Sequence, residues 1–86
     1  MNDDLQTRFI LAREKVLAQD SRPSTTDLLK LYAHFKQATE GDCVGDRPGA
    51  VDFVSRAKYD AWKNLEGTTK AHAAQAYIAI VETLDE

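Results

Sequence analysis

The residues of this 86-residue sequence best suited to chemistry are cations placed beside aromatic rings. Lys36 follows Tyr32 by four positions and Phe35 by one, in a segment whose leucines and rings recur at helical spacing. At about 100° per residue, Lys36 falls inside the apolar arc of that helix and not on its polar side. A lysine ammonium holds phosphate as a point charge, and an aromatic face can stack on a heterocycle. The pattern therefore predicts either a site for an anionic ligand with apolar parts or a lysine whose stem covers apolar surface while its ammonium reaches water.

Two further segments repeat this arrangement. Lys58 lies in an apolar arc between Trp62 and Leu65, and Arg13 lies at the edge of the apolar stripe that contains Phe9. Cations in apolar arcs on three helices predict convergence on one ligand that carries phosphates and a flat ring. A sixteen-carbon tail buried beside them would contribute on the order of 10 kcal/mol before ordering costs. The rings and apolar residues available for this purpose are Tyr32, Phe35, Tyr77, Leu29, Ile10 and Leu17.

Catalysis and metal binding are poorly supported by the remaining residues. His34 and His72 fall on polar faces of different helices, which predicts solvated surface histidines. Cys43 has no neighbouring histidine or lysine in sequence to lower its pKa. The aspartates of the segment 42–52 do not follow the calcium-loop spacing, and the sequence has no zinc pattern and no glycine-rich phosphate loop. We therefore expect no enzyme activity, no metal and no cofactor.

The elements that must position these residues are helices, because no alternation typical of a strand occurs. Apolar periodicity and end signals predict four helices: residues 5 to about 19, Ser24 or Thr25 to Gly41, about 54 to 65, and about 70 to 84. Pro23 breaks the pattern between the first two, Ser24 and Thr69 are the expected N-caps of the second and fourth, and Gly41 is the expected stop of the second. In the second of these, Gln37 is expected on the polar face and, in the third, Val54 on the apolar arc. The connector 42–52 is longer than the 2–8 residues usual between adjacent antiparallel helices, so we expect it to cross the bundle. The predicted fold class is all-α, a four-helix bundle.

Composition places the chain among ordinary globular domains, with 43% hydrophobic and 29% charged residues. A net charge of −3 offers no basic surface for nucleic acid, and no apolar run approaches the ~20 residues of a membrane-spanning helix. The acidic N-terminus does not resemble a signal peptide, and a single cysteine fits a reducing compartment. We expect one domain over residues 1–86, cytoplasmic, without membrane insertion and without a nucleic-acid partner.

Four motifs together closely resemble the acyl-CoA-binding protein family. They are LYAHFKQATEGD at 31–42, RPG at 47–49, AKYDAWKNLEGT at 57–68 and AYI at 76–78. The resemblance covers essentially the whole chain. It implies an up-down-down-up bundle in which the long connector joins two parallel helices. It also implies a long-chain acyl-CoA thioester as ligand, held without chemical change. We therefore expect a carrier and buffer of acyl-CoA, a monomer, that serves acyl-CoA-using enzymes of lipid metabolism.

The resemblance also implies roles for individual residues. Lys36 and Lys58 would hold the 3′-phosphate of CoA with help from Tyr32, while Tyr77 and Phe35 would border the adenine. The candidate ligand-binding set is Tyr32, Ala33, His34, Phe35, Lys36, Lys58, Tyr77, Arg13 and Leu29.

The chain departs from the family pattern at several positions. Phe35 lacks the hydroxyl of the usual tyrosine, Tyr59 replaces the more usual tryptophan, and Leu17 stands where many members have a lysine, for which Arg13 is the candidate substitute. The basic C-terminal tail common in the family is absent. The alternative interpretation is a helical interaction module that binds a partner helix in the same groove. A phosphate requires lysines flanked by tyrosines there, whereas a partner helix does not.

Overall fold

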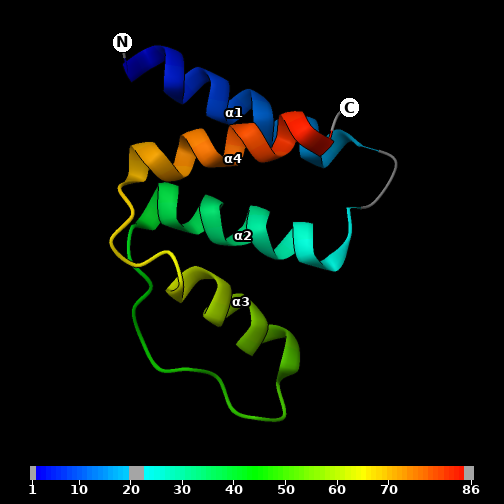
Figure 1. Ribbon diagram of the computed structural model, residues 1–86, viewed down its shortest axis with the longest axis vertical. Coiled ribbons are helices and arrows are strands. Elements are labelled where there is room, and N and C mark those ends of the chain that lie inside the picture. The colour runs from blue at the N-terminus through cyan, green and yellow to red at the C-terminus, as the bar shows by residue number, and fades with distance from the viewer. Residues whose placement is uncertain (1, 20–22, 85–86) are drawn as a thin grey trace.

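The computed structural model describes residues 2–19 and 23–84, which form four helices and no strand (Figure 1). This confirms the predicted all-α class. The first helix begins earlier than expected and the third ends earlier, while the fourth has the predicted bounds. The break predicted around Pro23 lies partly outside the described residues. The helices are α1 (Asn2–Ala18), α2 (Thr25–Glu40), α3 (Phe53–Lys63) and α4 (Lys70–Leu84).

Side-chain caps fix where three of these helices begin. The Ser24 hydroxyl accepts the N–H of Asp27 at 3.2 Å, and the Thr69 hydroxyl accepts the N–H of His72 at 3.1 Å. The Asp52 carboxylate caps α3 in the same way. At the other end of α2, Gly41 has a φ of +85°, a conformation that side-chain-bearing residues rarely adopt. The predicted caps at Ser24 and Thr69 and the glycine stop are confirmed.

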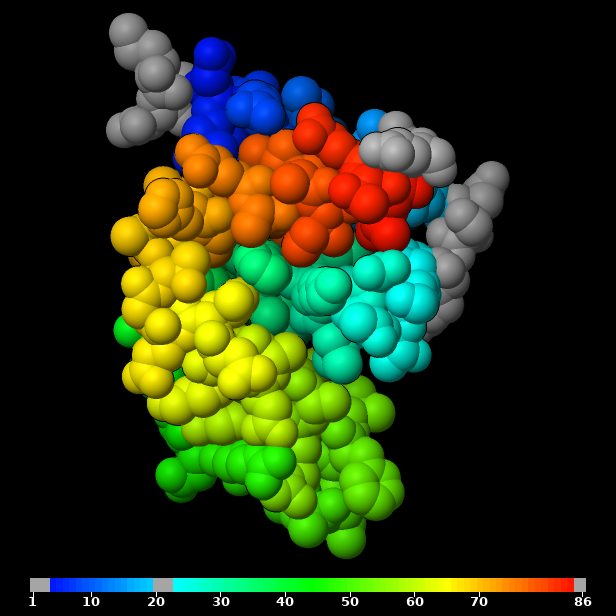
Figure 2. Space-filling view, in the orientation of Figure 1, coloured from blue at the N-terminus to red at the C-terminus, as the bar shows by residue number. Residues whose placement is uncertain are grey.

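The helices lie in a flat row in the order α1, α4, α2, α3 (Figure 1). α4 packs against both α1 and α2, while α2 is the only described helix against which α3 packs. Figure 2 shows α4 spread across one face between α1 and α2. α2 and α3 run in the same direction, opposite to α1 and α4, and the connector returns along the length of α3 (Figure 1). The up-down-down-up order and the crossing connector are therefore confirmed.

The core is built on the apolar face of α4, which contributes four of its seven buried members. These are Phe9 and Ala12 of α1, Leu31 of α2, and Ala74, Tyr77, Ile78 and Val81 of α4. Val54 was expected in this apolar set but is 66% exposed. The reason is the inclination of α3, whose first turn diverges from α2 (Figure 1).

Gln37 is a second correction, because it is fully buried and not on a polar face. Its Nε2 donates to Oδ1 of Asp42 and to the carbonyl of Thr68, both at 2.8 Å, and the same Oδ1 accepts the N–H of Gly67 at 2.9 Å. Gln37, Asp42, Gly67 and Thr68 form what we call the Gln37 corner. This corner ties the end of α2 to the turn that leads into α4.

Candidate functional site

Two neighbouring hollows surround α2, and Tyr32 lines both. The first, of about 280 Å³, opens between α1 and α2; the second, of about 350 Å³, opens between α2, α3 and the connector. The α1–α2 hollow is lined by Arg13, Leu17, Leu31, Tyr32, Phe35, Lys36 and Tyr77. The α2–α3 hollow is lined by Tyr32, Cys43, Val44, Pro48, Ser55, Lys58, Tyr59 and Trp62. Residues from distant sequence positions thus line two hollows that share a single tyrosine.

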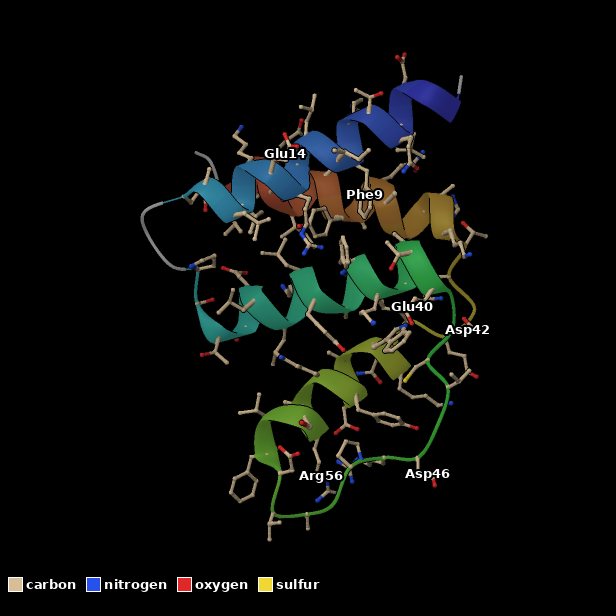
Figure 3. The ribbon with its side chains drawn as sticks, turned by 180° about the vertical axis from the view of Figure 1, so that it is seen from behind. Phe9, Glu14, Glu40, Asp42, Asp46 and Arg56 are labelled. Carbon is tan, nitrogen blue, oxygen red and sulfur yellow. The ribbon has the colours of Figure 1, made fainter. Side chains whose placement is uncertain are left out.

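Three rings pack together beside the α1–α2 hollow, and two of them, Phe35 and Tyr77, line it. Phe9 stacks on Phe35 with centroids 5.6 Å apart, and it meets Tyr77 edge-on at 5.1 Å. Figure 3 labels Phe9, whose side chain points from α1 toward α2. Tyr77 is only 2% exposed, and this burial raises the pKa of its hydroxyl, an effect that the nearby Arg13 opposes. The Tyr77 hydroxyl therefore stays protonated and able to donate at neutral pH.

The guanidinium of Arg13 lies over this ring cluster. Its Cζ is 3.9 Å from the centroid of the Phe35 ring, close enough for a cation–π contact between α1 and α2. Arg13 makes no ion pair within the described residues. One cation is thus placed at the hollow without a carboxylate that neutralises it.

The two lysines cross between the parallel helices α2 and α3. The Nζ of Lys36 lies 5.0 Å from the Trp62 ring, and the Nζ of Lys58 lies 5.3 Å from the Tyr32 ring. On α2 the ring precedes the lysine by four positions, whereas on α3 the lysine precedes the ring by four. Because the two helices run in the same direction, each lysine faces the ring of the other helix. We call Arg13, Tyr32, Phe35, Lys36, Lys58, Trp62 and Tyr77 the cation–ring face.

Lys36 differs from the other two cations because it has a carboxylate partner. Its ammonium donates to Oε2 of Glu40, one helical turn further along α2. This hydrogen bond raises the pKa of Lys36, which the partial burial of the side chain opposes. Lys36 is therefore fully charged at neutral pH.

The connector is fixed against α3 by hydrogen bonds that shape the second hollow. The Tyr59 hydroxyl donates to the carbonyl of Gly45 at 2.9 Å. Trp62 Nε1 donates to the carbonyl of Gly41 at 2.8 Å. Arg47 forms two parallel bonds with Asp60, at 2.9 and 2.7 Å. The Tyr59 and Trp62 rings are thus oriented by their polar ends, with their faces left for contacts in the hollow.

The predicted candidates are only partly brought together. Arg13, Tyr32, Phe35, Lys36 and Tyr77 line the first hollow, and Lys58 lines the second. Leu29 is half-buried and lines neither.

Two neighbours on α2 were also candidates. Ala33 is 2% exposed and lines neither hollow. His34 is half-buried and not freely solvated as expected, with its Nδ1 2.7 Å from the carbonyl of Lys30 on its own helix.

Sequence reasoning missed Trp62 as a site residue and Glu40 as a partner of Lys36. Glu40 lies four positions after Lys36, so helical spacing carried a signal for that pair, whereas Trp62 contacts a lysine of another helix, which no spacing within α3 indicates. The sequence places Trp62 on the apolar arc of its helix, and the structure adds its contact with Lys36.

The hollows combine cations, rings and apolar side chains. No carboxylate lines either of them, and within the described parts of the chain no cluster of three or more histidine, cysteine or acidic side chains could hold a metal. No described helix is long and apolar enough to cross a membrane. Cations over rings beside apolar surface can hold an anionic ligand that has flat and hydrocarbon parts.

Comparison with known proteins gives one consistent result. The family model described as acyl-CoA-binding protein matches residues 6–81. An acyl-CoA-binding protein homolog of Manduca sexta is 48% identical over 81 residues, which cover 93% of this chain and 90% of the relative. The acyl-CoA-binding protein of Dictyostelium discoideum is 44% identical over 91% of this chain and 93% of its own. The crystal structure of Oryza sativa acyl-CoA-binding protein 2 superposes with a TM-score of 0.92 at 38% identity, over 96% of this chain and 90% of the rice chain.

Proposed function

The chain belongs to the acyl-CoA-binding protein family, and from this premise we propose that it binds long-chain fatty acyl-CoA thioesters non-covalently and carries them. The observation that supports the proposal best is the cation–ring face. Three cations from three helices lie over rings around two joined hollows, and no carboxylate lines them. A nucleotide with phosphates and a purine ring needs such a surface.

The six candidate residues that line the hollows each have a role in this proposal. Lys36 and Lys58, which approach the α2–α3 contact from opposite sides, hold the phosphate of the nucleotide as point charges. Tyr32 lies between the hollows and donates to the same phosphate. Phe35 and Tyr77 border the purine, and Arg13 covers the outer side of that pocket.

The hydrocarbon tail has apolar surface next to these groups. Leu17 lines the α1–α2 hollow and is 70% exposed, and Ile10 on the same helix is 47% exposed. A tail laid over such residues removes apolar area from water, which stabilises the complex in proportion to the area covered. Head and tail therefore contribute together, and neither half of the ligand alone should bind tightly.

Calorimetric titration with palmitoyl-CoA, free CoA and palmitate in parallel tests the proposal. We expect tight one-to-one binding of the thioester and much weaker binding of both halves. The thioester should be recovered intact by mass spectrometry, because the protein is proposed to hold it without catalysis and without a cofactor. No heat and no thermal stabilisation with any of the three ligands would refute the carrier function.

Four finer points belong to the same proposal. Residues 1–86 form a single acyl-CoA-binding domain, the protein is a monomer, it works in the cytoplasm, and it hands its ligand to acyl-CoA-using enzymes. Light scattering with and without palmitoyl-CoA should give the mass of one chain of 9.6 kDa. A concentration-dependent increase in mass would contradict the monomer.

A further inference from the structure

The three cations of the cation–ring face are not equivalent. Arg13 and Lys58 lie over rings and make no ion pair within the described residues, whereas Lys36 is paired with Glu40. Figure 3, in which Glu40 is labelled, shows this residue at the end of α2 next to α3. One of the two lysines proposed to hold phosphate thus already has an anion on its ammonium.

We infer that Glu40 is an internal competitor for the ligand's phosphate at Lys36, and that it lowers affinity and selects the charge of the anion bound. This inference rests on the proposed function. A ligand phosphate and the Glu40 carboxylate both accept hydrogen bonds from the same ammonium. The phosphate therefore has to displace the carboxylate or share the ammonium with it. The carboxylate therefore subtracts from the affinity that Lys36 could otherwise supply.

The contacts of Lys36 favour competition over a role for Glu40 in positioning the lysine. The ammonium is also held over the Trp62 ring, so its placement does not depend on Glu40 alone. The Lys36 side chain is 25% exposed, but that of Glu40 is 54% exposed and can turn into water at little cost. The more exposed partner of the pair is thus the anion that has to leave.

Glu40 does not stabilise the helix that carries it. It is the last residue of α2, where the macrodipole is negative and a carboxylate is unfavourable. An i,i+4 pair with the lysine on the N-terminal side is also the weaker of the two orientations. A neutral glutamine at this position should leave the helix at least as stable, so the variant is expected to fold.

Charge determines which anions can displace Glu40. A phosphomonoester carries about two negative charges at neutral pH and three acceptor oxygens, whereas chloride and carboxylates carry one charge. Glu40 should therefore keep singly charged anions off Lys36 and admit a terminal phosphate. It should also speed release of the ligand, because it reoccupies the lysine as the phosphate leaves.

The test compares Glu40→Gln with wild type in titrations with palmitoyl-CoA. Exposed ion pairs contribute little, so we expect a gain in affinity of about two- to five-fold, mainly through slower dissociation. Palmitoyl-pantetheine, which has the thioester and the tail but no phosphate, should bind both proteins equally. Glu66→Gln is the matched control, because Glu66 also pairs with a lysine, Lys63, at a distance of 3.4 Å, and neither residue lines a hollow. This control should change the affinity for neither palmitoyl-CoA nor palmitoyl-pantetheine.

A double-mutant cycle separates a direct effect on Lys36 from a general effect of charge. In a Lys36→Met background, Glu40→Gln should give no gain in palmitoyl-CoA affinity. An equal gain with and without Lys36, an equal gain for palmitoyl-pantetheine, or a loss of affinity in Glu40→Gln would each overturn the inference. These outcomes leave the carrier proposal intact, which fails only if wild type does not bind palmitoyl-CoA.

Discussion

The Gln37 corner and the cation–ring face are both polar clusters at α2, but they are built in opposite ways. In the corner, donors and acceptors meet one another: Gln37 is fully buried and bonds to Asp42 and Thr68. On the cation–ring face, Arg13 and Lys58 meet aromatic rings and no carboxylate within the described residues. The first cluster uses its donors internally and leaves Oε1 of Gln37 without a partner, whereas two of the three cations of the second keep their charge available.

This difference separates structural from binding residues on the same helix. A buried polar group has to be paired within the protein, because leaving it unpaired costs about 1–3 kcal/mol. A partly exposed cation keeps its hydration and can exchange water for a ligand. Gln37 and Lys36 are adjacent in sequence, yet we expect substitution of one to affect stability and of the other to affect affinity.

The largest expected effect is on the corner. Gln37→Ala should lower the free energy of unfolding by about 2–4 kcal/mol, because it leaves a cavity and removes the donor for the Thr68 carbonyl. Denaturant titration measures this loss. Palmitoyl-CoA affinity, measured where the variant is still folded, should change less than two-fold. Gln75→Ala, at an exposed position of α4, is the control. A stable Gln37→Ala variant with lost affinity would contradict the division between the regions.

The second largest expected effect is a loss of ligand affinity at the cation–ring face. Lys36→Met and Lys58→Met should each weaken palmitoyl-CoA binding by about 1.5–3 kcal/mol, the usual loss for a hydrogen bond to a charged group. Stability should change by less than about 0.5 kcal/mol, as is common for partly exposed positions. Lys63→Met, at the end of α3, should leave affinity unchanged. If both variants fold and bind as wild type does, the assigned phosphate site is wrong.

Trp62 connects the two regions, so its substitution should affect both moderately. Its Nε1 donates to Gly41, next to the corner, and its ring lies under Lys36. Trp62→Phe should lower stability by about 1 kcal/mol through the lost hydrogen bond while keeping a ring for the lysine. Thermal unfolding followed by circular dichroism and calorimetric titration measure the two effects. An unchanged unfolding free energy would show that the bond to Gly41 contributes nothing.

The smallest expected effect depends on pH. The N–H of Gly67, and then Gln37, lower the pKa of the Asp42 carboxyl below its ordinary value. Stability from the charged carboxylate is therefore complete above the unfolded pKa of about 3.9, and it is lost as pH falls through the lower pKa of the folded state. The melting temperature of Asp42→Asn should lie below that of wild type by a constant amount between pH 5 and 7, and the difference should close in stronger acid.

The control for this pH dependence is Asp46→Asn, in the same connector, whose carboxylate makes no hydrogen bond in the described part of the chain. It should follow wild type throughout. A difference for Asp42→Asn that persists at the lowest pH would mean that the shape of the side chain, and not its charge, matters.

Much of the fold followed from local patterns. Ser24, Thr69 and Gly41 act where their types and spacing predicted, because caps are short-range interactions. The apolar stripes predicted which face of each helix is buried, except at Val54 and Gln37, whose burial depends on how other parts of the chain pack. Val54 is exposed because α3 is inclined to α2, and the apolar periodicity within α3 does not predict that inclination.

The candidate site divides in the same way. The sequence by itself determined that Lys36, Lys58 and Arg13 lie in apolar arcs, because a helix of 3.6 residues per turn fixes which side chains share a face. Only the tertiary structure decided that Lys36 contacts Trp62, that Lys58 contacts Tyr32, and that Gln37 is fully buried. Helical periodicity assigns a direction to a side chain within its own helix, whereas its partners depend on the parallel packing of α2 and α3 and on the path of the connector between them.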